Sequence, residues 1–353
     1  MTAMRIKIKD RWIGEKEPVF VVAEAGVNHN GNMNLAKKLI DYAVEAGADA
    51  VKFQSFKTES VITKNAPSAQ YHIRATGGRE TWFELLKRLE LKEEEHFELL
   101  NYCNEKGIIF FSTPYDEESA DFLNKIGIPV FKVASTDLNN IPLLKRITSY
   151  AKPIFLSTGM SNLVEVRESV EVILRGGNEQ IVLLQCTANY PPRVEDANLN
   201  VIEAFKKEFN LLVGYSDHLT SSQAAIAAIA KGACVYEVHY TLDRNLPGPD
   251  QRSSMEPREL KQVIMDIRLT EKVLGSFIKE VTPSEEETRD KLRKSIVANK
   301  DIKAGDKLTE QNIGIKRPGS GLPPKFYYSI LGKISKRNIA KDELIRFEDL
   351  SDA

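Results

Sequence analysis

Short apolar runs alternate with longer amphipathic segments through most of this chain. In the amphipathic segments, such as residues 34–47 and 162–177, apolar residues recur every three or four positions, which is typical of helices with one buried face. The apolar runs have the length of strands, and eight of them follow one another: 19–24, 49–54, 108–113, 130–135, 153–158, 181–186, 211–216 and 234–240. This alternation predicts a parallel sheet covered by helices, an α/β fold.

Eight such units between residues 19 and 275 predict closure into a (β/α)8 TIM barrel, whose usual length is about 250 residues. An open, doubly wound sheet is the alternative, but the first turn has the sequence AEAGVNHNG and lacks the expected GxGxxG pattern. The long second connection begins with a polar stretch, residues 57–80, which favours a loop at the active site.

The pattern changes near residue 276, where a charged segment, VTPSEEETRDKLRKS, precedes several short β-like pieces. We therefore predict a barrel domain at 1–281, a linker at 282–294 and a small, mostly β domain at 295–353. The last segment is short for an independent core, so we expect it to dock onto another surface.

Composition and charge exclude several classes of protein. Lys and Arg total 49 and Asp and Glu total 50, so the net charge of −1 argues against binding to nucleic acid or to an anionic membrane. No apolar run reaches the ~18 residues of a membrane span, and the N-terminus lacks the apolar core of a signal peptide. The three cysteines form no CxxC pair, which favours reduced, buried thiols in a cytoplasmic protein.

Polar residues stand at the carboxyl end of every predicted strand, where barrel enzymes carry their chemistry. Two lysines, Lys52 and Lys132, are each flanked by apolar neighbours, so strand alternation directs both ammonium groups into the barrel. They could instead extend to solvent at the strand ends. The functional interpretation is an anion site, completed by strand-end hydroxyls and suited to a ligand with phosphate and carboxylate groups: Thr113, Ser135, Ser157 and Ser216.

Histidines and a glutamate add further candidates at the same edge. His218 and His239 end the seventh and eighth strands, where two imidazoles could hold a divalent metal or could simply be satisfied by hydrogen bonds. Glu24 ends the first strand, where it could act in catalysis, pair with a lysine, or do both. His96 lies in a charged helical segment, and we expect it on the solvated surface.

The strand-end motifs together resemble the sialic acid (nonulosonic acid) synthases. The segments that carry the resemblance are AEAGVNHNG, VKFQ, FSTPYD, FKVAS, LSTGM, CTANYP, GYSDH and HYTLDRNLPGPD, in this order. The segment SIVANKDIKAGDKLTEQNIGIKRPG is similar to the antifreeze-like (SAF) domain of the same family. The match runs from about Phe20 to the end of the chain.

This resemblance implies a transferase that condenses phosphoenolpyruvate with an open-chain N-acylhexosamine, as a domain-swapped homodimer and with Mn²⁺ or Mg²⁺. His218 and His239 would act in catalysis as the ligands of the metal, and Arg317 would reach the partner subunit's active site and bind the sugar there. The other expected roles are catalytic for Glu24 and Asp137, phosphoenolpyruvate binding for Lys52, Thr113, Lys132, Ser135, Ser157 and Ser216, and sugar binding for Gln54, Tyr190 and Asp250.

Three positions depart from the family pattern, and all are expected near the sugar or the intermediate. Ala188 stands where N-acetylneuraminate-forming members often have Asn, Asp137 where Glu is common, and Gln251 where His often follows GPD. The sequence therefore leaves the N-acyl sugar open. Two other functions stay as alternatives: a synthase acting on a phosphorylated aldose, and a carbohydrate- or ice-binding protein.

Overall fold

The computed structural model describes residues 4–67, 73 and 80–352. The chain divides into two compact units, Met1–Gly275 and Ser276–Ala353. Of the loop predicted at 57–80, residues 68–72 and 74–79 lie outside the described part. No helix in the part that the structure describes is long and apolar enough to cross a membrane.

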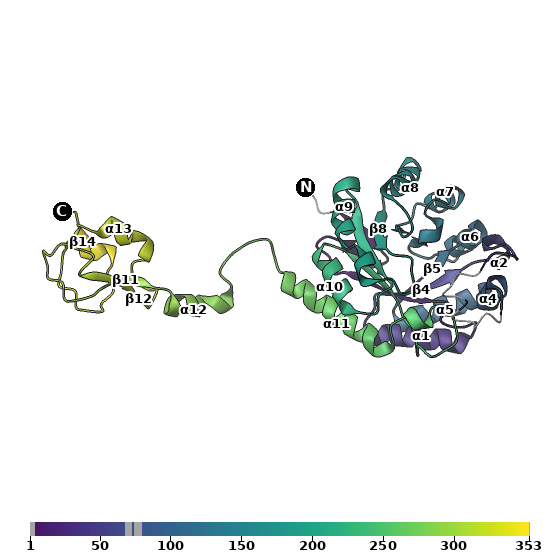
Figure 1. Ribbon diagram of the computed structural model, residues 1–353, viewed down its shortest axis with the longest axis horizontal. Coiled ribbons are helices and arrows are strands. Elements are labelled where there is room, and N and C mark those ends of the chain that lie inside the picture. Colours follow the sequence, from purple (N-terminus) through teal and green to yellow (C-terminus); the bar gives the residue numbers. More distant parts are fainter. Residues whose placement is uncertain (1–3, 68–72, 74–79, 353) are drawn as a thin grey trace. The chain divides into compact units, whose positions relative to one another are not determined.

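The first unit is built on an eight-stranded parallel sheet with the order β5-β4-β3-β10-β9-β8-β7-β6. Its end strands β5 and β6 lie side by side, so the sheet curves into a nearly closed barrel and the predicted fold is confirmed (Figure 1). Each of the eight predicted runs overlaps one strand: β3 (Phe20–Gly26), β4 (Ala50–Ser55), β5 (Ile109–Pro114), β6 (Phe131–Val133), β7 (Ile154–Ser157), β8 (Ile181–Cys186), β9 (Leu212–Asp217) and β10 (Val235–His239).

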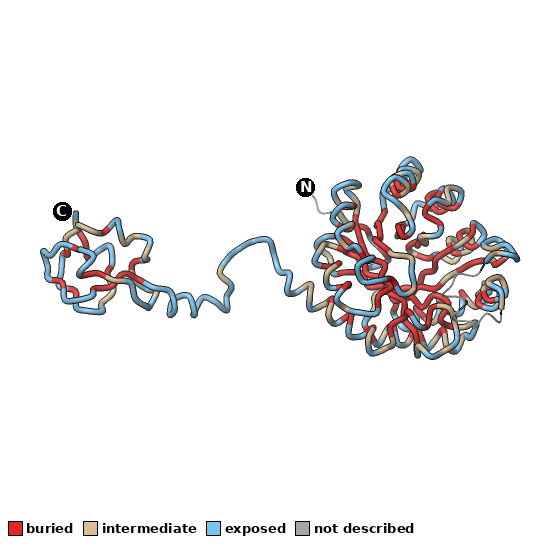
Figure 2. The backbone as a smooth tube through the Cα atoms, in the orientation of Figure 1, coloured by how far each residue is buried: buried red, intermediate tan, exposed pale blue. Residues whose placement is uncertain are grey.

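Helices cover the outside of this barrel, and the strands between them are buried (Figure 2). Helix α1 shows how the sequence sets such bounds: Asn32 accepts hydrogen bonds from the backbone at its start, and Gly47 ends it with a left-handed φ of 83°. The helices are α1 (Met33–Ala46), α2 (Thr58–Val61), α4 (Trp82–Leu89), α5 (Glu93–Lys106), α6 (Glu117–Lys125), α7 (Ile141–Thr148), α8 (Leu163–Arg175), α9 (Asn200–Phe209), α10 (Ser222–Ala230) and α11 (Pro257–Leu274), with 3₁₀ turns η1 (Ser135–Asp137), η2 (Val194–Ala197) and η3 (Gln251–Ser253).

The prediction that His96 lies on the surface is wrong. It is only 2% exposed, and its Nε2 lies 2.5 Å from the hydroxyl of Ser55 on β4. The charged residues around it in α5 misled the prediction, because His96 belongs to the helix face that packs on the barrel.

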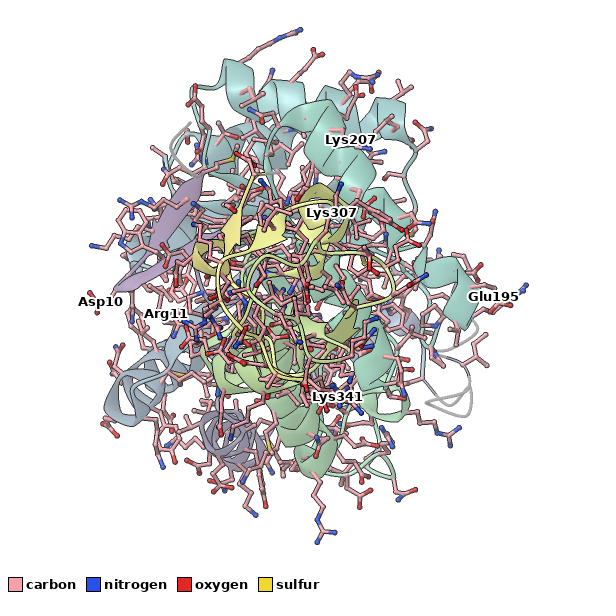
Figure 3. The ribbon with its side chains drawn as sticks, turned by 90° about the vertical axis from the view of Figure 1, so that its left-hand side faces the viewer. Asp10, Arg11, Glu195, Lys207, Lys307 and Lys341 are labelled. Atoms are coloured by element: carbon pink, nitrogen blue, oxygen red, sulfur yellow. The ribbon has the colours of Figure 1, made fainter. Side chains whose placement is uncertain are left out.

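A two-stranded hairpin, β1 (Arg5–Ile8) and β2 (Arg11–Gly14), lies by the amino ends of the barrel strands. Figure 3 shows Asp10 and Arg11 at the outer edge of this hairpin, and Arg11 forms an ion pair of 2.8 Å with Asp49. The carboxylate of Asp49 also accepts from the backbone N–H of Val21 and from Arg268 of α11, at 2.8 and 2.9 Å. One carboxylate thus ties the hairpin, the start of β3 and the last barrel helix together.

The second unit has a small core of its own. Its elements are α12 (Pro283–Leu292), β11 (Ser295–Ala298), β12 (Ile313–Lys316), η4 (Pro324–Phe326), α13 (Tyr327–Ile330), β13 (Ile334–Ser335), η5 (Phe347–Asp349) and β14 (Leu350–Ser351). The core is made of apolar residues from throughout the unit, such as Ile296, Leu308, Ile330 and Ile345. Most of the predicted linker forms α12. Thr282 and Glu285 form a capping box at the start of this helix, and Pro283 is its first residue.

Candidate active site

The two lysines predicted to point inward are buried inside the barrel, at 3% exposure for Lys52 and 4% for Lys132. The ammonium group of Lys52 lies 3.0 Å from Glu24 and donates to the Thr113 hydroxyl at 2.9 Å. Lys132 lies on β6, on the other side of the cluster. The interpretation that these lysines extend to solvent is therefore excluded, since neither ammonium group is exposed.

A second glutamate, Glu237 on β10, joins the two lysines. Its carboxylate lies 3.3 Å from the ammonium group of Lys132 and 3.6 Å from that of Lys52, and it accepts a hydrogen bond of 2.9 Å from Ser216. Although burial acts to raise the pKa of Glu237, the ammonium groups of Lys132 and Lys52 outweigh it and lower the pKa to about 2. Glu237 is therefore ionised at neutral pH.

The remaining predicted hydroxyls lie at the ends of neighbouring strands. Ser135 accepts a hydrogen bond from the backbone N–H of Gly159 at 2.9 Å. The hydroxyl of Ser157 is buried and has no hydrogen-bond partner among the described residues. A buried hydroxyl without a partner is costly, so a ligand group at this position would satisfy it.

Glu24 lies at the meeting point of the lysine cluster and the histidines. The amide of Gln54 donates to its carboxylate at 3.2 Å. A Cβ atom placed on Gly26 would stand 3.3 Å from both of these side chains and 3.6 Å from His239, so the three converge around a glycine with a φ of +52°. Burial raises the pKa of Glu24 to about 7 even though Lys52 acts in the opposite direction.

The two histidines are neighbours, with ring centroids 5.3 Å apart. The ring of Tyr190 packs against both, with its centroid 4.3 Å from that of His218 and 5.7 Å from that of His239. The Nδ1 atom of His218 lies 2.8 Å from the carbonyl oxygen of Thr187, so Nε2 is the ring nitrogen that could bind a metal. Asp250 lies 4.0 Å from Nδ1 of His239.

This arrangement fits a metal with few protein ligands. The buried Nδ1 of His239 has no hydrogen-bond partner among the described residues. No group of three His, Cys, Asp or Glu side chains in the described part of the chain is arranged to hold an ion alone. Two imidazoles could hold a divalent ion only if substrate or water supplied the other ligands, as in a Lewis-acid site.

The other two predicted residues, Asp137 and Arg317, make hydrogen bonds within the unit to which each belongs. Asp137 accepts hydrogen bonds from Thr136 and Asn140 in its own turn, and burial raises the pKa of Asp137. Arg317 belongs to the second unit, where it donates to the carbonyl of Leu292 at 3.1 Å.

Gln251 and Ala188, two of the three residues that depart from the family pattern, lie in different environments. Gln251 is fully buried, where it accepts from the Thr241 hydroxyl and donates to the Asn28 carbonyl at 3.1 Å, so it holds the loops after β3 and β10 together. Ala188 lines a cavity of about 760 Å³ between the ends of β7 and β8 and helices α8 and α9.

Glu237 is the site residue whose role the sequence analysis missed. The alternation that directed the lysines inward also applies here, because Glu237 precedes His239 by two positions and so shares its face of β10. Alternation could not predict that Glu237 pairs with Lys132, because these two residues meet only when the barrel closes.

Fold and site together define a barrel enzyme with a buried cluster of two lysines and two glutamates beside two histidines. Residues 39–279 match the model of the NeuB family and residues 293–351 match that of the SAF domain, so the chain belongs to the NeuB family. The N,N'-diacetyllegionaminic acid synthase of Campylobacter jejuni is 45% identical over 92% of this chain and 98% of its own. The N-acetylneuraminate-9-phosphate synthase of Mus musculus is 37% identical over 96% of this chain and 95% of its own.

A solved structure agrees with this assignment. The N-acetylneuraminic acid (sialic acid) synthetase of Leptospira borgpetersenii is 34% identical, with a TM-score of 0.73 over 81% of this chain and 95% of its own. The resemblance inferred from the strand-end motifs is therefore confirmed.

Proposed function

We propose that this protein condenses phosphoenolpyruvate with an open-chain N-acylhexosamine and water, giving a nine-carbon 2-keto-3-deoxy sugar acid and phosphate. The observation that carries the proposal is the pair of buried lysines on β4 and β6, in the same barrel interior as the two histidines. The names of the relatives, which are synthases of nonulosonic acids, support the same reaction class.

Lys52 and Lys132 would bind the phosphate and carboxylate of phosphoenolpyruvate. Both ammonium groups are already desolvated and held by carboxylates, so they need little rearrangement when an anion arrives. The hydroxyls of Thr113, Ser157 and Ser216 would add neutral hydrogen bonds. The same groups would receive the phosphate that leaves at the end of the reaction.

Glu24 would act where charge develops. When the C3 carbon of phosphoenolpyruvate bonds to the aldehyde carbon, positive charge develops at C2, and a neighbouring carboxylate stabilises it. Glu24 would then accept a proton from the water that adds to C2, and loss of phosphate would leave the keto group. A pKa near 7 suits such a general base, and the Gln54 amide orients its carboxylate.

His218 and His239 would hold Mn²⁺ or Mg²⁺, which when bound would polarise the aldehyde oxygen of the sugar. Tyr190 packs on both imidazoles and so restricts their rotation. Asp250 lies beside His239, where it could orient that ring or contact a sugar hydroxyl.

The names of the relatives suggest two candidates for the sugar substrate. The relative at 45% identity is named for N,N'-diacetyllegionaminic acid, which favours a 2,4-diacetamido-trideoxyhexose over N-acetylmannosamine. The relative at 37% identity is named for a 9-phosphate product, so a phosphorylated hexosamine is the second candidate.

Three further expectations accompany the proposal. The family resemblance supports a domain-swapped homodimer in which Arg317 contributes to the partner subunit's site. It also supports a catalytic role for Asp137. The three free, buried cysteines are compatible with a cytoplasmic location.

The test is a panel assay of phosphate release from phosphoenolpyruvate. The panel contains a 2,4-diacetamido-trideoxyhexose, N-acetylmannosamine and N-acetylmannosamine 6-phosphate, each with and without a chelator, and Mn²⁺ or Mg²⁺ is added back after chelation. We expect metal-dependent release with a non-phosphorylated sugar, and with the diacetamido sugar most of all. Release with the 6-phosphate alone would favour the second candidate, and no release with any sugar would contradict the proposed reaction.

A further inference from the structure

The buried cluster contains one charged group to which the proposed reaction gives no role, the carboxylate of Glu237. It is 4% exposed, and it contacts three residues that are predicted to bind phosphoenolpyruvate: Lys52, Lys132 and Ser216. Those residues come from β4, β6 and β9, so a single side chain on β10 links its neighbour β9 with β4 and with β6 across the barrel.

Of the two lysines, Lys132 depends more strongly on Glu237 for a counterion. Lys52 has two carboxylates within 4 Å, those of Glu24 and Glu237, whereas the Glu237 carboxylate is the partner of Lys132 among the described ion pairs. A buried ammonium group without a counterion is strongly disfavoured. Removing the charge of Glu237 would therefore leave Lys132 without this ion-pair partner and Lys52 with one carboxylate.

We propose that Glu237 is the positioning residue of the phosphoenolpyruvate pocket: its carboxylate holds the ammonium groups of Lys52 and Lys132, and the hydroxyl of Ser216, at the spacing that the incoming anion requires. The inference rests on the proposed function. When Glu24 is ionised, the two carboxylates of Glu24 and Glu237 balance the two ammonium groups, so the lysines have counterions inside the barrel before substrate binds.

Two variants separate the charge of Glu237 from its shape. Glu237→Gln keeps the size and can still accept from Ser216, but it removes the negative charge. Glu237→Asp keeps the charge and shortens the reach by one methylene. The matched control is Glu208→Gln on α9, whose carboxylate pairs with Arg167 on the surface and is 39% exposed.

The readout is direct binding of phosphoenolpyruvate and of inorganic phosphate to the full chain by calorimetry, without sugar, together with Mn²⁺ affinity. We expect Glu237→Gln to lower the affinity for both anions at least tenfold. Glu237→Asp should lower it less, and Glu208→Gln should bind both anions as the wild type does. Mn²⁺ affinity should stay within twofold in all three. In turnover, KM for phosphoenolpyruvate should rise more than kcat falls.

Unchanged anion binding by Glu237→Gln in a folded sample would overturn the inference. So would a loss of Mn²⁺ affinity with anion affinity retained, because the carboxylate would then serve the metal. If Glu237→Gln does not fold, Glu237→Asp decides alone: anion binding equal to wild type contradicts the role, and weaker binding supports it. Absence of phosphoenolpyruvate binding by the wild type would instead contradict the proposed function.

Discussion

At the residue scale, burial of ionisable groups dominates this site. Glu24 and Glu237 lie in the same cluster, yet their pKa values are displaced in opposite directions, to about 7 and about 2. For Glu24 the cost of burial prevails, whereas for Glu237 the two lysines prevail. One carboxylate is therefore suited to exchange a proton near neutral pH, and the other to remain a fixed charge.

The pKa of Glu24 predicts the acid limb of the pH profile. A general base works deprotonated, so kcat should fall about tenfold per pH unit below about 7. Glu24→Gln should lose this limb and lower kcat by about 10²–10⁴-fold with phosphoenolpyruvate binding retained. The measurement is phosphate release between pH 5.5 and 8.5. Full turnover by the variant would show that Glu24 is not the base.

His29 predicts a loss of stability in acid. Burial lowers its pKa to about 4 from an ordinary 6.5. Between these values the unfolded chain binds a proton that the folded chain does not, so stability falls as pH falls, by about 3 kcal/mol in total. When the free energy of unfolding is measured with urea from pH 7 to pH 4, it should fall less steeply with falling pH for His29→Asn than for wild type. Equal slopes would mean that His29 is not the titrating group.

At the element scale, the two ends of the barrel have different tasks. The carboxyl ends of the strands carry the clustered charges, whereas the amino ends are tied to the β1–β2 hairpin and α11 through Asp49. In barrels, residues at the amino ends support stability and those at the carboxyl ends support catalysis.

Asp49→Ala tests this division. The substitution leaves Arg11, Arg268 and the Val21 N–H without their acceptor, so we expect a loss of about 2–3 kcal/mol in the free energy of unfolding with kcat/KM unchanged. Arg175→Ala is the control, since its pair with Glu171 is exposed and should cost less than about 0.5 kcal/mol. Urea titration measures both. A loss of activity without a loss of stability in Asp49→Ala would contradict the assignment.

At the scale of the whole molecule, the chain contains two units with separate cores. The expected contribution of Arg317 to another subunit requires that two chains share each active site. Such sharing predicts that two inactive variants can complement each other, because a mixed dimer can assemble one intact site.

Mixing Lys132→Met with Arg317→Ala tests the domain-swapped dimer. After the subunits are exchanged at equal concentration, a swapped dimer should recover about a quarter of wild-type activity, since half of the dimers are mixed and each has one intact site. A site completed within one chain should recover nothing. The assay is phosphate release, with each variant alone as the baseline.

The sequence by itself determined the fold class and the inward direction of Lys52 and Lys132. Periodicity and strand alternation are local properties, and they depend only on neighbouring residues. The resemblance to the family then predicted the roles of the polar residues near the strand ends. For His96 the local charge pattern was misleading, because burial depends on which helix face meets the barrel.

Only the tertiary structure decided which charges meet. Glu237 joins Lys52 and Lys132, and Asp49 joins Arg11 and Arg268, across long separations in the chain. The sheet order places β4 two strands from β10, and barrel closure brings β6 opposite β10; no local pattern encodes either distance. The buried charge balance of this site is therefore a property of the closed barrel, because the energy of each group depends on partners that the fold alone supplies.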